Sequence, residues 1–124
     1  MKKGVLIKSD LTVQPIELAE PLHRSLAAAV GGLFEIVRPI NLKQPYVFVS
    51  NEESLILDLP INEVGCYLYG TYAHGHPIAG NIVIMKEGVV NDDGEWDLIS
   101  LNDHELAIVL EAMSSTAEVY RHAK

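Results

Sequence analysis

The chain has 124 residues, of which 48% are hydrophobic and 21% charged, a composition typical of a folded globular protein rather than a disordered one. Its length predicts a single domain, residues 1–124, built around one core. The net charge of −8 argues against nucleic acid as a partner, and no apolar run reaches the roughly 18 residues of a membrane span, so we expect a cytoplasmic protein that contacts neither.

The charge is unevenly distributed along the chain. Residues 1–50 contain six Lys/Arg and four Asp/Glu, whereas residues 51–124 contain three Lys/Arg and thirteen Asp/Glu. The acidic second part suits a basic protein partner, although solubility alone explains the same charge. The single cysteine, Cys66, excludes an internal disulfide, and its apolar neighbours predict a buried, unreactive thiol.

Two strands are expected at the start of the chain, over residues 4–9 and 11–18, with a tight connection between them. Pro15 predicts that the second strand lies at an edge of the sheet, because proline cannot donate to a ladder. Residues 21–30 predict the first helix, which begins with a proline, repeats apolar residues at helical spacing and ends at a pair of glycines. Since these glycines follow a helix rather than precede one, they do not indicate a phosphate-binding loop.

A hairpin is predicted at the centre of the chain. A strand over residues 33–39 leads through a loop into residues 46–50, which form the first strand of the hairpin. Residues 51–54 are polar and suit its turn, and the apolar residues 55–57 are expected to form its second strand.

The next part of the chain is less regular. Residues 63–72 are compatible with a helix or a strand, and Asn62 is placed to cap the helical alternative. Residues 69–77 are rich in Gly, Tyr and His and are expected to form an exposed loop. Two further strands are predicted at residues 81–85 and 96–99, joined by an Asn-Asp-Asp-Gly turn.

The last predicted element is a helix over residues 103–120. Asn102 and Glu105 have the spacing of a capping box at its start. Apolar side chains repeat along one stripe that should pack across the sheet, while Ile108 lies off the stripe and suggests a second contact, such as a subunit interface. The elements together predict an α+β fold with one mixed or antiparallel sheet and two main helices packed on it.

Short motifs follow one another in a fixed order: Val30-Gly31-Gly32, Glu35-Ile36-Val37, Asn51-Glu52-Glu53, Leu59-Pro60-Ile61-Asn62 and Ser100-Leu101-Asn102-Asp103. In this order they resemble a family of small uncharacterised domains common in bacteriophages and other mobile elements, over most of residues 20–110. Ser54 stands where that family has glycine. The resemblance implies an accessory protein with no known activity, of a kind that often counters host defence by binding rather than by catalysis.

Polar and aromatic side chains on strand ends, turns and loops are the candidates for a ligand-binding site: Arg38, Asn51, Glu52, Asn62, Tyr69, Tyr72, His74 and His76. Arg38 ends an apolar strand, where a guanidinium can hold a carboxylate or phosphate bidentately; a structural salt bridge is the alternative. His74 and His76 have a spacing that can present two imidazoles to a metal ion, but we favour a mobile loop, or else a polar ligand-binding or interface loop, over a metal site. We expect no metal, no cofactor and no catalytic residue, because no nucleophile–base pair, metal signature or phosphate loop is apparent.

Two functions of different classes follow from these features. The first is a non-catalytic protein that captures a small nucleotide-like or otherwise polar ligand, at a site that the subunits of a homo-oligomer could share. The second is an acidic inhibitor, resembling DNA in its charge, that blocks a host protein with residues 87–118 as its face. A basic pocket in an acidic shell would favour capture, and a continuous acidic face would favour inhibition.

Overall fold

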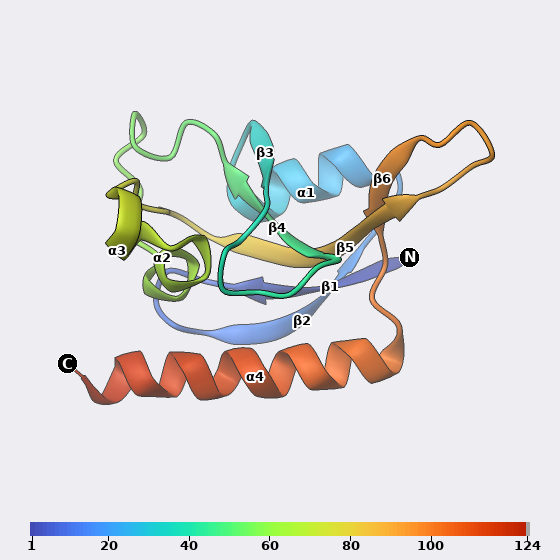
Figure 1. Ribbon diagram of the computed structural model, residues 1–124. Coiled ribbons are helices and arrows are strands. Elements are labelled where there is room, and N and C mark those ends of the chain that lie inside the picture. The colour runs from blue at the N-terminus through green and yellow to red at the C-terminus, as the bar shows by residue number, and fades with distance from the viewer. Residues whose placement is uncertain (124) are drawn as a thin grey trace.

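The computed structural model describes residues 1–123. Within them the strands are β1 (Lys2–Ile7), β2 (Val13–Leu18), β3 (Phe34–Val37), β4 (Tyr46–Asn51), β5 (Ile82–Val89) and β6 (Trp96–Ile99), and the helices are α1 (Leu22–Val30), α2 (Glu63–Tyr69), α3 (Thr71–His74) and α4 (Asp103–His122). The strands form one antiparallel sheet in the order β2-β1-β5-β4-β3, and β6 pairs with the C-terminal half of β5. Helix α1 packs on one face, and α2 and α4 cover the other (Figure 1). The predicted α+β class is confirmed.

Strand β5 is the centre of the sheet and divides the core into two layers. Ile82 and Ile84 point toward α2 and α4, whereas Val83 and Met85 point toward α1. All four side chains are fully buried. This follows from the alternation of side chains in a strand whose two faces are both covered by helices.

The first two strands and the first helix form as the sequence predicts. Pro15 lies opposite Val5 in β2, which is an edge strand, so its missing N–H interrupts no inner ladder. Pro21 occupies the position before the first residue of α1 and forms no side-chain cap, and the helix ends at Gly31, whose φ of 85° requires the left-handed region that glycine enters without strain.

The prediction of a second strand for the central hairpin is wrong. Residues 52–58 form a series of turns, closed by a hydrogen bond from the Leu57 N–H to the Glu53 carbonyl at 2.9 Å, and Ile56 is 83% exposed. The reason lies in the sheet: β3 and β5 already pair with the two sides of β4, so no position beside it is free. The positive φ in this segment falls at Asp58 rather than at Ser54.

The irregular region resolves into two short helices. Asn62 caps α2, so the helical alternative for this part of the chain is correct and the strand alternative is wrong. The predicted exposed loop contains α3, a single exposed turn of helix. Cys66 is half-buried, and its Sγ accepts a hydrogen bond from the Ile78 N–H at 3.2 Å, so the thiol has a structural role.

The C-terminal elements also agree with the sequence. Strands β5 and β6 form the predicted hairpin, although β5 extends further than expected, to Val89. Asn102 and Glu105 form both hydrogen bonds of the capping box at the start of α4. The apolar stripe of α4 packs on β1 and β2, while Ile108 remains half-exposed.

In the described part of the chain, no helix combines the length and apolar character needed to cross a membrane.

Candidate functional site

Two hollows in the described part of the chain lie next to residues that the sequence singles out. The first, which we call the Arg38 cleft, has a volume of about 320 Å³ and is lined by residues that include Arg38, Gln44, Pro45, Tyr46, Glu87 and Trp96. The second, which we call the edge pocket, has a volume of about 420 Å³ and is lined by residues that include Glu35, Ser50, Glu52, Ser54, Tyr69 and His76. The predicted site residues are therefore divided between two places.

Alternation along two strands brings the charged residues of the Arg38 cleft together. Arg38 follows β3 directly and continues the row of Phe34 and Ile36, which faces α1. Glu87 lies on the same face of β5, where it is paired with Leu98 of β6. Residues that are far apart in the sequence thus meet on the α1 side of the sheet.

Arg38 and Glu87 form a bidentate ion pair. The Nε atom of Arg38 donates to Oε1 of Glu87 at 2.7 Å, and Nη2 donates to Oε2 at 2.9 Å. The carboxylate side chain is only 13% exposed, whereas the guanidinium side chain is 67% exposed. Glu87 therefore fixes the orientation of a guanidinium whose remaining N–H groups face solvent and are available to an acceptor.

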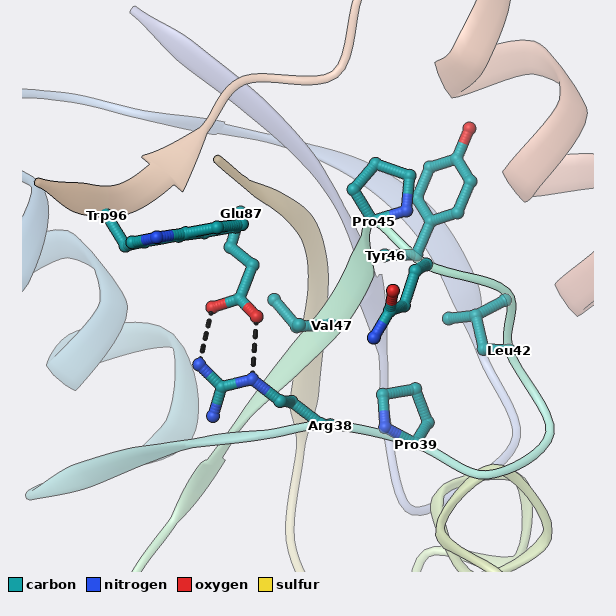
Figure 2. Close-up of a pocket in the computed structure, with 9 residues that line it drawn as sticks. Arg38, Pro39, Leu42, Pro45, Tyr46, Val47, Glu87 and Trp96 are labelled. Carbon is teal, nitrogen blue, oxygen red and sulfur yellow. Dashed lines mark hydrogen bonds and ion pairs between the residues drawn. The ribbon is translucent and has the colours of Figure 1, made fainter. Parts of the chain in front are cut away.

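Trp96 supplies an aromatic surface beside this pair. It is the first residue of β6 and is 65% exposed, a large fraction for an aromatic side chain of this size, which is mostly buried on average. Figure 2 shows the indole on the far side of the Glu87 carboxylate from Arg38, with Pro39, Leu42 and Pro45 across the cleft. The cleft thus combines a stacking surface with an oriented hydrogen-bond donor.

The edge pocket lies on the opposite face of the sheet, between β3, β4 and the loops that precede β5. It brings together Asn51, Glu52, Tyr69 and His76 from the predicted set. The amide of Asn51, however, is committed elsewhere: Nδ2 donates to the Val30 carbonyl at 3.1 Å, and Oδ1 accepts from the Glu53 N–H at 2.8 Å. Asn51 therefore ties the end of α1 to β4.

His74 has a structural role in its loop. The His76 N–H donates to Nδ1 of His74 at 3.1 Å, which leaves the ring proton on Nε2, 3.2 Å from the Tyr69 carbonyl. Both ring nitrogens are thus bonded to backbone groups, so a metal ion could bind His74 only by displacing one of them. Within residues 1–123, no three His, Cys, Asp or Glu side chains are grouped to hold a metal ion. Tyr72 is 75% exposed, and its hydroxyl accepts from Asn41.

Asn62 lies in the core and is inaccessible to a ligand. Its Nδ2 donates to the carbonyls of Ile7 at 3.0 Å and Gly80 at 2.9 Å, and its Oδ1 accepts from the Gly65 N–H at 2.9 Å. The side chain is fully buried. Its polar atoms therefore join α2 to β1 and to the segment before β5.

Sequence reasoning missed two residues of the Arg38 cleft. Glu87 is separated from Arg38 by 49 positions, so no local spacing links them. The sequence places Trp96 in a strand, and only its position as the single tryptophan at the start of a short strand hints at an exposed role.

Comparison with known proteins relates most of the chain to a family. Residues 1–114 match a family model described as a domain of unknown function (DUF3846). No curated protein gives a significant match. Among solved structures, the crystal structure of the small RNA methyltransferase HEN1 is similar, with a TM-score of 0.51 and 15% sequence identity. The similarity covers 85% of this chain but 15% of that one, so the likeness concerns the fold of a small part of that protein.

Proposed function

We propose that the chain, which belongs to the DUF3846 family, captures a small planar polar ligand of nucleotide type in the Arg38 cleft without converting it chemically. The observation that carries this proposal is that the exposed Trp96 lines the same cleft as a guanidinium that Glu87 holds in one orientation. A nucleobase stacks favourably on an indole, and the free N–H groups of Arg38 donate to oxygen or nitrogen atoms at its edge or to a phosphate.

The size of the cleft supports a ligand of one nucleotide or less. Its volume of about 320 Å³ is at the lower end of the range of about 300–1,000 Å³ that small-molecule sites have. The charge points the same way, because a protein with a net charge of −8 repels a polyphosphate or an oligonucleotide. We therefore favour a nucleoside or a nucleoside monophosphate.

The biological setting that we propose follows from the motif order described above. A protein of a bacteriophage or another mobile element that sequesters such a ligand in the host cytoplasm would deprive a nucleotide-dependent defence of its signal. Capture of this kind needs affinity and abundance, and it needs no catalytic group.

The test is a titration of intrinsic fluorescence. Trp96 is the only tryptophan, so its emission reports on the cleft directly. We expect at least one of AMP, GMP, CMP and UMP to quench this emission with saturation. Arg38→Gln should weaken that binding about tenfold or more, because it removes one or two charge-assisted hydrogen bonds to the ligand. Native mass spectrometry of the protein purified from cells would identify a copurified ligand.

The control is Arg24→Gln, which removes an exposed arginine of α1 and changes the net charge equally. This variant should bind like the parent. Absence of quenching by all four nucleotides, or equal weakening by both variants, would contradict the proposal. Circular dichroism would verify that each variant is folded.

A further inference from the structure

Strand β3 forms an edge of the sheet and has unpaired backbone groups. The Glu52 N–H donates to the Leu33 carbonyl at 3.0 Å, which marks these two residues as a hydrogen-bonded pair of the β3–β4 ladder. Because such pairs alternate, Glu35 also bonds to β4, and the N–H and C=O groups of Phe34 and Ile36 point outward. Among residues 1–123, no backbone hydrogen bond occupies these outward groups.

The other edge of the five-strand path is protected. Strand β2 contains Pro15, which removes one N–H, and α4 packs against β2. Proline and a covering helix are two of the devices by which proteins prevent strand addition. Strand β3 contains no proline, and Ile36 exposes 41% of its surface on the α1 side of the edge. The two edges therefore differ in their ability to accept another strand.

The edge pocket lies beside β3 on the opposite face. Glu35 and Glu52, both exposed, contribute carboxylates to its lining, and no Lys or Arg of residues 1–123 contributes to it. Ser50 and Ser54 also line it; they are 2% and 9% exposed, and neither hydroxyl forms a hydrogen bond within the described chain. Carboxylates and free hydroxyls are the groups that accept hydrogen bonds from a Lys or Arg side chain.

We propose that β3 is a docking edge for an extended basic segment of a partner protein, which adds to the sheet as an antiparallel strand. Opposite residues of an antiparallel pair share a face, so the partner residue opposite Glu35 is Lys or Arg and reaches the edge pocket. Its two neighbours lie opposite Phe34 and Ile36 and are apolar. The segment thus has the pattern apolar–basic–apolar.

Charge complementarity favours another protein over a second copy of this chain. Pairing two copies through β3 would bring together Glu35, Glu52 and Glu53 of each, in chains that each carry a net charge of −8. A basic segment relieves this repulsion instead of doubling it. The docking edge uses neither Arg38 nor Trp96, so it is independent of the nucleotide proposal.

A fluorescein-labelled peptide, Ser-Val-Arg-Ile-Arg-Val-Ser, tests the proposal by fluorescence anisotropy near physiological salt. We expect saturable binding to the parent protein and at least tenfold weaker binding of the same peptide with both Arg replaced by Glu. Two variants test the contacts. Glu35→Lys reverses the charge beside the pocket, and Ile36→Pro removes one outward N–H while the ladder to β4 is retained.

Each variant has a control. Glu111→Lys, on an exposed position of α4, changes the net charge as Glu35→Lys does and should bind the peptide like the parent. Thermal midpoints close to that of the parent would show that Ile36→Pro and Glu35→Lys are folded. Tenfold or greater loss in both folded variants supports the proposal. Absence of binding, equal binding by all variants, or equal losses of affinity in Glu35→Lys and Glu111→Lys would overturn the proposal. It would also be overturned if sedimentation showed that the parent forms a dimer and that Ile36→Pro dissociates this dimer.

Discussion

Replacing Asn62 with alanine should destabilise the protein far more than the loss of an ordinary helix cap. The substitution leaves the Gly65 N–H without its capping partner and removes one hydrogen bond from each of the Ile7 and Gly80 carbonyls, in a fully buried site. Each buried polar group left without a partner costs about 1–3 kcal/mol, and a water molecule entering the small polar cavity recovers part of this. We therefore expect Asn62→Ala to lower the free energy of unfolding by about 3–5 kcal/mol, out of a total of about 5–15 kcal/mol for a typical domain.

Asn102 provides a matched comparison, because it is also an asparagine that caps a helix but its side chain is exposed. Asn102→Ala should lower the free energy of unfolding by about 1 kcal/mol. Urea denaturation followed by circular dichroism would measure both. Asn62→Ser, which keeps a cap acceptor but loses the two donations, should fall between them and covers the case in which Asn62→Ala does not fold. Equal losses for Asn62→Ala and Asn102→Ala would refute the assignment of Asn62 to the core network.

Two other substitutions test packing and electrostatics. Gly65→Ala should destabilise α2, because the new Cβ would lie 2.8 Å from Cγ2 of the buried Ile78. Overpacking of this kind costs about 1–3 kcal/mol, which outweighs the helix preference of alanine over glycine of about 1 kcal/mol. Thermal denaturation should show a lower midpoint for Gly65→Ala, and a higher one when the same substitution is made in an Ile78→Ala background. The Asn102 backbone N–H, and then Lys86, hold the pKa of Glu105 below its ordinary value of 4.5. Because the folded-state pKa is lowered, the stability that Glu105 contributes is complete above pH 4.5 and is lost as the pH falls through the lowered pKa. The difference in urea midpoint between the parent and Glu105→Gln should therefore shrink in that acid range. A difference in urea midpoint that stays constant with pH would contradict this.

Features encoded by neighbouring residues could be predicted, and those that depend on distant residues could not. The capping box of Asn102 and Glu105 and the edge position of Pro15 follow from local chemistry, and the structure agrees with both. The apolar residues 55–57 resemble a strand by every local criterion, yet β3 and β5 occupy both sides of β4 and leave them exposed in a turn. Only the complete sheet reveals that competition.

The candidate sites show the same limit. The place of Arg38 at the end of an apolar strand identifies it as a candidate, but its carboxylate partner comes from a strand 49 positions away. The sequence predicts that Asn62 caps a helix, whereas its buried hydrogen bond to the Ile7 carbonyl joins residues 55 positions apart. A polar residue that is useful to a ligand and one that is used by the core look alike until the long-range contacts are known.

The central place of β5 has a consequence for the synthesis of the protein. Strands β1 and β2 pair with each other, and so do β3 and β4, but the two pairs are joined only through β5 (Figure 1). On the ribosome, residues 82–89 must leave the exit tunnel before the sheet can close, and α4 emerges later still. A nascent chain that ends before β5 therefore holds two isolated strand pairs, each marginally stable in water. We therefore expect the sheet to close only after β5 has left the tunnel, and the unpaired edges of these strands to be exposed to other chains until then.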